Sequence, residues 1–61
     1  MPIIRAEMFP DRTVDQKRNL VRKLTDGFVR ACGGPGDRLH AIITEIDRED
    51  WGVGGQLMSA R

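Results

Sequence analysis

The sequence predicts an α/β fold in which one helix joins two parallel strands, followed by a short C-terminal hairpin. Three observations predict it: an alternating segment near the amino terminus, a long amphipathic segment after it, and a second segment rich in β-branched residues. A crossover helix of about five turns joins parallel strands, and the connection should be right-handed. The 61 residues have room for one domain, which we expect to span residues 1–61.

The first strand is expected at residues 3–9, where apolar and polar side chains alternate. Alternation places Ile4, Ala6 and Met8 on one face of the sheet, and the intervening residues on the other. Pro10 and the aspartate after it are turn formers and should end the strand.

The helix is expected to begin after Thr13, which is a good N-cap and has Gln16 three residues later, as in a capping box. Apolar residues then recur at helical spacing: Val14, Leu20, Val21, Leu24, Phe28 and Cys32. Cys32, at the end of this stripe, is interpreted as a small buried hydrophobic residue. The run 33–36 (Gly-Gly-Pro-Gly) should stop the helix, because glycine favours the C-cap and proline cannot continue a helix.

The second strand is expected at residues 39–46, with β-branched residues 42–44 at its centre. The segment 51–57 is too rich in glycine for a helix, so we interpret it as a turn or a short hairpin.

Self-association is expected from the small size of the chain. A monomer of this length buries only about 60% of the surface that its unfolded chain exposes. The single Cys32 excludes an internal disulfide, and one cysteine with one histidine does not make a structural zinc site. One helix covers only one face of a two-stranded sheet, so the other face should meet another copy of the chain.

The charges nearly cancel, with 10 basic and 9 acidic residues. Nucleic acids and acidic membranes are therefore not expected as partners, and we interpret the basic helix face as a solvated surface. The sequence has no apolar run of about 20 residues and no signal-peptide pattern, so we expect a cytoplasmic protein.

Pro2 is the strongest candidate for chemistry. A methionine before a small second residue is usually trimmed, which would leave a secondary amine on Pro2. An α-amino group titrates near ~7.7–8.0, and desolvation or a nearby cation would bring its pKa close to neutral. Such a base can move a proton on and off carbon. If Met1 is retained, the Pro2 nitrogen is an amide and cannot act in this way.

Several features occur together at matching positions: Pro2 before an apolar strand, Arg12 before the helix, and Asp15-Gln16-Lys17 in its first turn. Ile42-Ile43-Thr44-Glu45 follows on the second strand, and Trp51-Gly-x-Gly-Gly comes near the end. In this spacing the chain resembles the 4-oxalocrotonate tautomerase family of the tautomerase superfamily. The resemblance implies dimers with a four-stranded sheet, usually assembled as a trimer of dimers (a homohexamer). It also implies active sites between subunits and catalysis without a cofactor.

The resemblance further implies roles for five residues. Pro2 would be the general base and then the general acid, Arg12 would bind a substrate carboxylate, and Trp51 would form an apolar wall. His40 stands where the family commonly has arginine and cannot form a guanidinium fork. It could donate one hydrogen bond to an enolate oxygen, or it could be a partly exposed strand residue without a role. Arg38, two residues earlier, is expected on the same strand face and could partly substitute.

The function that follows is ketonisation of a dienol of an unsaturated 2-hydroxy or 2-keto acid, such as 2-hydroxymuconate. The His40 difference makes a monoacid substrate or a shifted activity plausible. Two alternatives stay open. The same scaffold could hydrate or dehalogenate a small unsaturated acid with Pro2 as a cationic acid, or it could serve as a non-catalytic oligomeric binding module.

Overall fold

The computed structural model describes residues 2–61, and Met1, with the expectation that it is removed, lies outside the described residues. The elements follow the expected order: strand, helix, strand, hairpin. Their bounds are β1 Ile3–Met8, α1 Val14–Cys32, β2 His40–Glu45, β3 Gly52–Val53 and β4 Gln56–Leu57. Short 3-10 helices occupy Gly36–Arg38, Arg48–Asp50 and Met58–Ala60.

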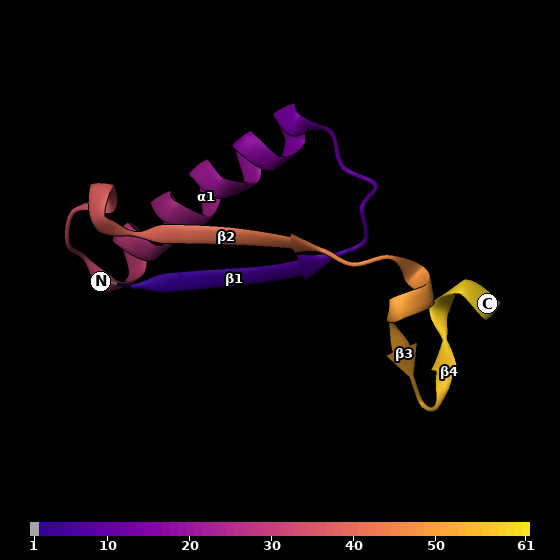
Figure 1. The fold of residues 1–61 in the computed structure, drawn as a ribbon. Helices are drawn as coiled ribbons and strands as arrows, with labels where there is room; N and C mark the ends of the chain where they lie inside the picture. Colours follow the sequence, from indigo (N-terminus) through magenta and orange to yellow (C-terminus); the bar gives the residue numbers. More distant parts are fainter. Residues whose placement is uncertain (1) are drawn as a thin grey trace.

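The strands β1 and β2 pair in parallel, from Ile3 opposite His40 to Met8 opposite Glu45. Further backbone hydrogen bonds continue the ladder at both ends. The His40 N–H donates to the Pro2 carbonyl (3.0 Å), and the N–H of Ile46 donates to the carbonyl of Met8 (2.8 Å). The helix α1 lies across one face of this sheet (Figure 1). The predicted β-α-β unit with parallel strands is therefore confirmed, with each strand ending within one residue of its expected limits.

Local signals set both ends of α1. The Gln16 N–H donates to Thr13 Oγ1 (3.1 Å), and the Thr13 N–H donates to Gln16 Oε1 (2.9 Å), which confirms the capping box. At the other end the Gly33 N–H donates to the carbonyl of Val29 (2.8 Å). Gly33 has a φ of 80°, a conformation that costs glycine nothing and L residues a steric penalty.

The two faces of the β1–β2 sheet differ in exposure. Ile4, Ala6 and Met8 are partly buried beneath α1, as the alternation predicts. On the opposite face, Ile3 is 51% exposed and Ile42 is 37% exposed. Within residues 2–61 no hydrophobic side chain reaches full burial.

The expectation that Cys32 is buried is wrong for the isolated protomer, where its side chain is exposed. Cys32 is the last residue of α1, and the chain leaves the helix at Gly33, so no further helical turn covers its side chain. At the other end of α1, which is inclined away from the strands (Figure 1), Val14 is 67% exposed.

The protomer is too open to be a self-contained globule. Its accessible surface is 4814 Å². A folded monomer of 6.9 kDa is expected to expose about 4,000 Å². The radius of gyration is 14.5 Å, against about 10.5 Å for a compact chain of this length. The β3–β4 hairpin, at the yellow end of the colour scale, extends away from the β-α-β body (Figure 1). These dimensions favour burial of more surface against further copies.

Candidate active site

Pro2 and His40 lie at the amino end of the parallel sheet. Pro2 directly precedes β1 and is partly buried, and its carbonyl accepts the hydrogen bond from the His40 backbone (3.0 Å). His40 is the first residue of β2, and its side chain is exposed. Because Ile3 pairs with His40 in the register, Pro2 and His40 are adjacent across the two strands.

Arg38 is not on the strand, so its predicted position on the same strand face as His40 is wrong. It is the last residue of the 3-10 helix Gly36–Arg38, and β2 begins two residues later. Pro35 and Gly36 favour a turn at this point, and the Leu39 N–H closes it by donating to the Gly36 carbonyl (3.2 Å). Arg38 is exposed near the amino end of the sheet.

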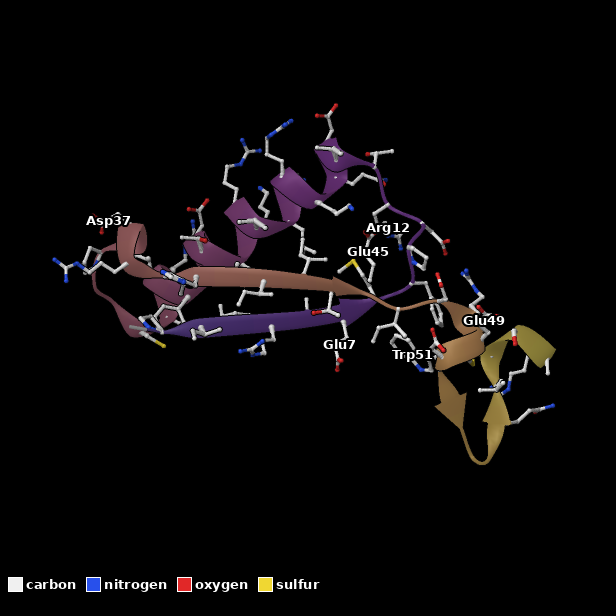
Figure 2. All side chains as sticks on the ribbon, in the orientation of Figure 1. Glu7, Arg12, Asp37, Glu45, Glu49 and Trp51 are labelled. Carbon is white, nitrogen blue, oxygen red and sulfur yellow. The ribbon has the colours of Figure 1, made fainter. Side chains whose placement is uncertain are left out.

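Arg12 and Trp51 lie at the opposite, carboxyl end of the sheet (Figure 2). Arg12 is in the loop that joins β1 to α1, and Trp51 follows the 3-10 helix Arg48–Asp50 that leads out of β2. Both segments come after the carboxyl end of a parallel strand, so the topology brings them to one edge.

A small cavity of about 190 Å³ opens beside Arg12. Met8 and Leu20 give it an apolar surface, and Arg12 and Lys17 give it cations. The Lys17 ammonium pairs with Glu45 (Nζ to Oε1, 2.9 Å), so its charge is already matched. Arg12 has no ion-pair partner among residues 2–61, which leaves its guanidinium free to bind a carboxylate.

An aromatic and cationic stack holds Trp51. The rings of Phe9 and Trp51 have centroids 4.5 Å apart and are tilted by 54°, which is a favourable aromatic geometry. The guanidinium carbon of Arg48 lies 4.3 Å from the Phe9 centroid, so the Phe9 ring contacts both Arg48 and Trp51. Trp51 is partly buried as a result.

The Arg48 guanidinium also forms a two-pronged ion pair with Asp11. Arg48 Nη1 donates to Asp11 Oδ1 (3.2 Å), and Nη2 donates to Oδ2 (2.5 Å). This hydrogen bonding is the main reason that the pKa of the Asp11 carboxyl lies below its ordinary value. Desolvation opposes this effect and raises the pKa of Asp11, whereas the charges of Arg48 and Arg12 lower it further. This ion pair joins the loop between β1 and α1, which contains Asp11, to the 3-10 helix that begins at Arg48.

One protomer does not bring all the predicted site residues together. Phe9 follows Pro2 by seven positions of extended chain, a span of about 23 Å. Pro2 and His40 are therefore far from Arg12 and Trp51 in the same chain. The sequence reasoning did not identify Phe9, Asp11 and Arg48 as neighbours of the site, because no local pattern links positions 37 residues apart.

Two further properties concern the described part of the chain. In residues 2–61 no helix is both long enough and apolar enough to cross a bilayer. In the same residues no group of three histidine, cysteine, aspartate or glutamate side chains is placed to hold a metal ion.

Comparison with known proteins gives a consistent result. The family described as "Tautomerase enzyme" matches residues 2–61. A "probable tautomerase" of Lactiplantibacillus plantarum is 34% identical over 59 residues, which cover 97% of this chain and 92% of that protein. The "2-hydroxymuconate tautomerase" of Pseudomonas putida is 32% identical over 56 residues, covering 92% and 89% of the two chains.

Among solved structures, a similar fold is found in a heterohexameric 4-oxalocrotonate tautomerase from Chloroflexus aurantiacus. The TM-score is 0.89 at 32% sequence identity, over 97% of this chain and 95% of that one. This agreement extends over the β-α-β unit and the hairpin alike.

Proposed function

The chain belongs to the tautomerase enzyme family, and from this premise we propose that it ketonises the dienol of an unsaturated 2-hydroxy acid. The base is the Pro2 amine, which becomes available once Met1 is removed. The observation that carries the proposal is the position of Pro2 at the start of β1, partly buried and next to His40. The similarity to the 2-hydroxymuconate tautomerase of Pseudomonas putida supports the substrate class.

The active site is assembled from more than one subunit. A two-fold axis perpendicular to the strands would reverse their direction, so that the amino end of β1 in one protomer meets the carboxyl end of the sheet in its partner. Pro2 and His40 of one copy then lie near Arg12 and Trp51 of another. The open sheet face and the excess surface of the protomer support such pairing. The heterohexamer of the Chloroflexus relative supports six copies as the complete assembly.

The reaction moves one proton without a cofactor. The neutral Pro2 amine takes the proton of the dienol hydroxyl, and the electron pair of the broken O–H bond forms the carbonyl. The conjugated double bonds shift, and the protonated amine then delivers the proton to a carbon further along the chain of double bonds. Pro2 is thus the base in the first half of the reaction and the acid in the second.

The other residues bind the substrate and stabilise charge. The Arg12 guanidinium holds a carboxylate and draws negative charge towards it during the reaction. Trp51 covers the flat conjugated substrate and excludes water, and this desolvation together with the Arg12 charge lowers the pKa of the Pro2 amine. His40 donates one hydrogen bond to the oxygen that becomes the carbonyl, and Arg38 contacts the same end of the substrate.

The test compares Pro2→Ala with the wild type, after intact mass has verified that Met1 is absent from both. A positioned acid–base group contributes about 10²–10⁴-fold, so we expect kcat/KM for 2-hydroxymuconate to fall by at least a hundredfold. Pro10→Ala, at an exposed loop proline, is the matched control and should keep full activity. A loss of less than tenfold in Pro2→Ala, or an active protein that retains Met1, would contradict the mechanism.

His40 favours a variant of this function in which the substrate carries one carboxylate. A single imidazole cannot form the two parallel hydrogen bonds that a guanidinium offers a carboxylate. Turnover of the monoacid phenylenolpyruvate should therefore exceed that of 2-hydroxymuconate. A pH–rate profile also separates isomerisation from hydration or dehalogenation on the same scaffold. A Pro2 base requires the neutral amine and gains activity as pH rises through its pKa, whereas a cationic acid loses activity.

A further inference from the structure

Arg48 contacts both segments that carry proposed substrate-binding residues at the carboxyl end of the sheet. It begins the 3-10 helix Arg48–Asp50, which ends directly before Trp51. Its guanidinium binds Asp11 through two hydrogen bonds and lies over the ring of Phe9 at 4.3 Å. Figure 2 shows Arg12 and Trp51 at this end of the sheet.

The first consequence concerns Trp51. The Phe9 ring contacts both residues: its centroid lies 4.3 Å from the guanidinium carbon of Arg48 and 4.5 Å from the ring centroid of Trp51. Arg48 and Trp51 are also joined through the backbone, since the Trp51 N–H donates to the Arg48 carbonyl (3.4 Å). Arg48 is therefore linked to the Trp51 ring through Phe9 and to the Trp51 backbone through this hydrogen bond.

The second consequence concerns Arg12. Asp11 is the residue next to Arg12, and the Arg12 charge is close enough to lower the pKa of the Asp11 carboxyl. Without Arg48, this carboxylate would be free to pair with the Arg12 guanidinium and compete with the carboxylate of a substrate. With Arg48, both Asp11 oxygens are occupied. Arg12 keeps its charge available for an external anion.

We propose that Arg48 is a positioning residue that withholds the Asp11 carboxylate from Arg12 and fixes Trp51 through Phe9, so that both can bind a conjugated carboxylate substrate. The proposal rests on the proposed function for the roles of Arg12 and Trp51. Arg48 itself touches neither substrate nor reacting atoms.

The test is a double-mutant cycle of Arg48→Ala, Asp11→Asn and the double variant. The probe is muconate, a conjugated dicarboxylate without the reacting hydroxyl. Its binding is followed by the fluorescence of Trp51, the single tryptophan of the chain. In Arg48→Ala, an exposed ion pair between Asp11 and Arg12 would weaken the binding of an external carboxylate to Arg12 by about two- to sixfold. Arg48→Ala should therefore raise the Kd for muconate by at least that factor.

The double variant distinguishes positioning from a general structural role. Asp11→Asn cannot neutralise Arg12, so on its own it should change the Kd by less than about twofold. In the Arg48→Ala background it should restore at least half of the lost affinity. In turnover assays, the KM should follow the Kd while kcat changes less. Arg18→Ala, which removes the exposed pair with Asp15 on the helix, is the matched control and should bind muconate normally.

Three outcomes would overturn the proposal: no rescue in the double variant, an equal loss in Arg18→Ala, or no muconate binding by the folded wild type. Circular dichroism and light scattering verify that each variant is folded and assembled. If the binding cycle behaves as expected but the wild type turns over no dienol, the proposed function fails and the positioning role stands. If turnover depends on Pro2 but the cycle shows no rescue, the opposite holds.

Discussion

Replacing Ile42 by aspartate should break the assembly of the protein. Ile42 lies at the centre of β2 on the face that α1 does not cover, and 37% of it is exposed in the protomer. The protomer exposes 4814 Å², roughly 800 Å² above the expectation for a compact chain of its mass. That excess equals the area that one partner contributes to a standard protein–protein interface, about 800 Å². The uncovered sheet face and the extended β3–β4 hairpin (Figure 1) both contribute to this excess, and we expect association to bury the sheet face.

The magnitude follows from the charge that the substitution would bury. Leaving an unpaired carboxylate in an interface costs about 3 kcal/mol or more. That raises the dissociation constant more than about a hundredfold. A two-fold axis places one such carboxylate on each side, so the effect on a dimer is larger. The change acts on assembly because Ile42 faces away from α1.

The assay is the mass in solution by size-exclusion chromatography with light scattering, over a dilution series. Six copies of the 6.9 kDa chain weigh about 41 kDa, and Ile42→Asp should shift the mass towards a single copy. Val14→Asp, at an exposed position on the first turn of α1, is the matched control and should leave the mass unchanged. A wild type that stays monomeric and unfolds cooperatively, or an Ile42→Asp variant that remains assembled, would refute the reasoning.

Three further predictions concern single contacts. The pKa of Asp11 is lowered in the folded protein, so its pair with Arg48 stabilises the fold above pH ~3.8 and is lost as pH falls through the folded value. Trp51 fluorescence should hold from pH 7 to about 5 and change below 3.8, and this acid transition should be weaker in Asp11→Asn; identical acid curves would contradict it. Thr13→Ala should lower the free energy of unfolding by about 1 kcal/mol in urea titrations, and Thr13→Ser should not. His40→Arg should raise kcat/KM for 2-hydroxymuconate relative to phenylenolpyruvate by about tenfold, and an unchanged ratio would count against a substrate contact at this position.

The elements of the fold could be predicted because their signals are local. The Thr13–Gln16 box sets the start of α1, and the glycine at position 33 with its φ of 80° sets the end. Alternation in β1 correctly assigned the residues beneath the helix. Where prediction failed, the residues lie at the ends of elements. Cys32 is exposed at the last residue of α1, and Arg38 lies in a 3-10 turn because Pro35 and Gly36 delay the start of β2.

The candidate site was predictable in part. Pro2 was selected from the chemistry of an amino-terminal amine, whereas Arg12, His40 and Trp51 were selected through the resemblance to the tautomerase family. Residue types alone do not place Pro2 and His40 at one end of the sheet and Arg12 and Trp51 at the other. This placement depends on the direction of the strands and on how the chain crosses from β1 to β2. The assignment of their roles remains a prediction that the Pro2, Arg48 and His40 variants test.

The sequence by itself determined the order of elements and the caps of the helix, because each depends on residues a few positions apart. The need for a partner stays a prediction from the small size of the chain. Only the tertiary structure decided that Arg48 binds Asp11, that Phe9 stacks on Trp51, and that Pro2 lies far from Arg12 in one chain. Exposed charges and single aromatic residues follow no periodic pattern. Their partners are set by the register of β1 against β2 and by the path of the connection that follows Glu45.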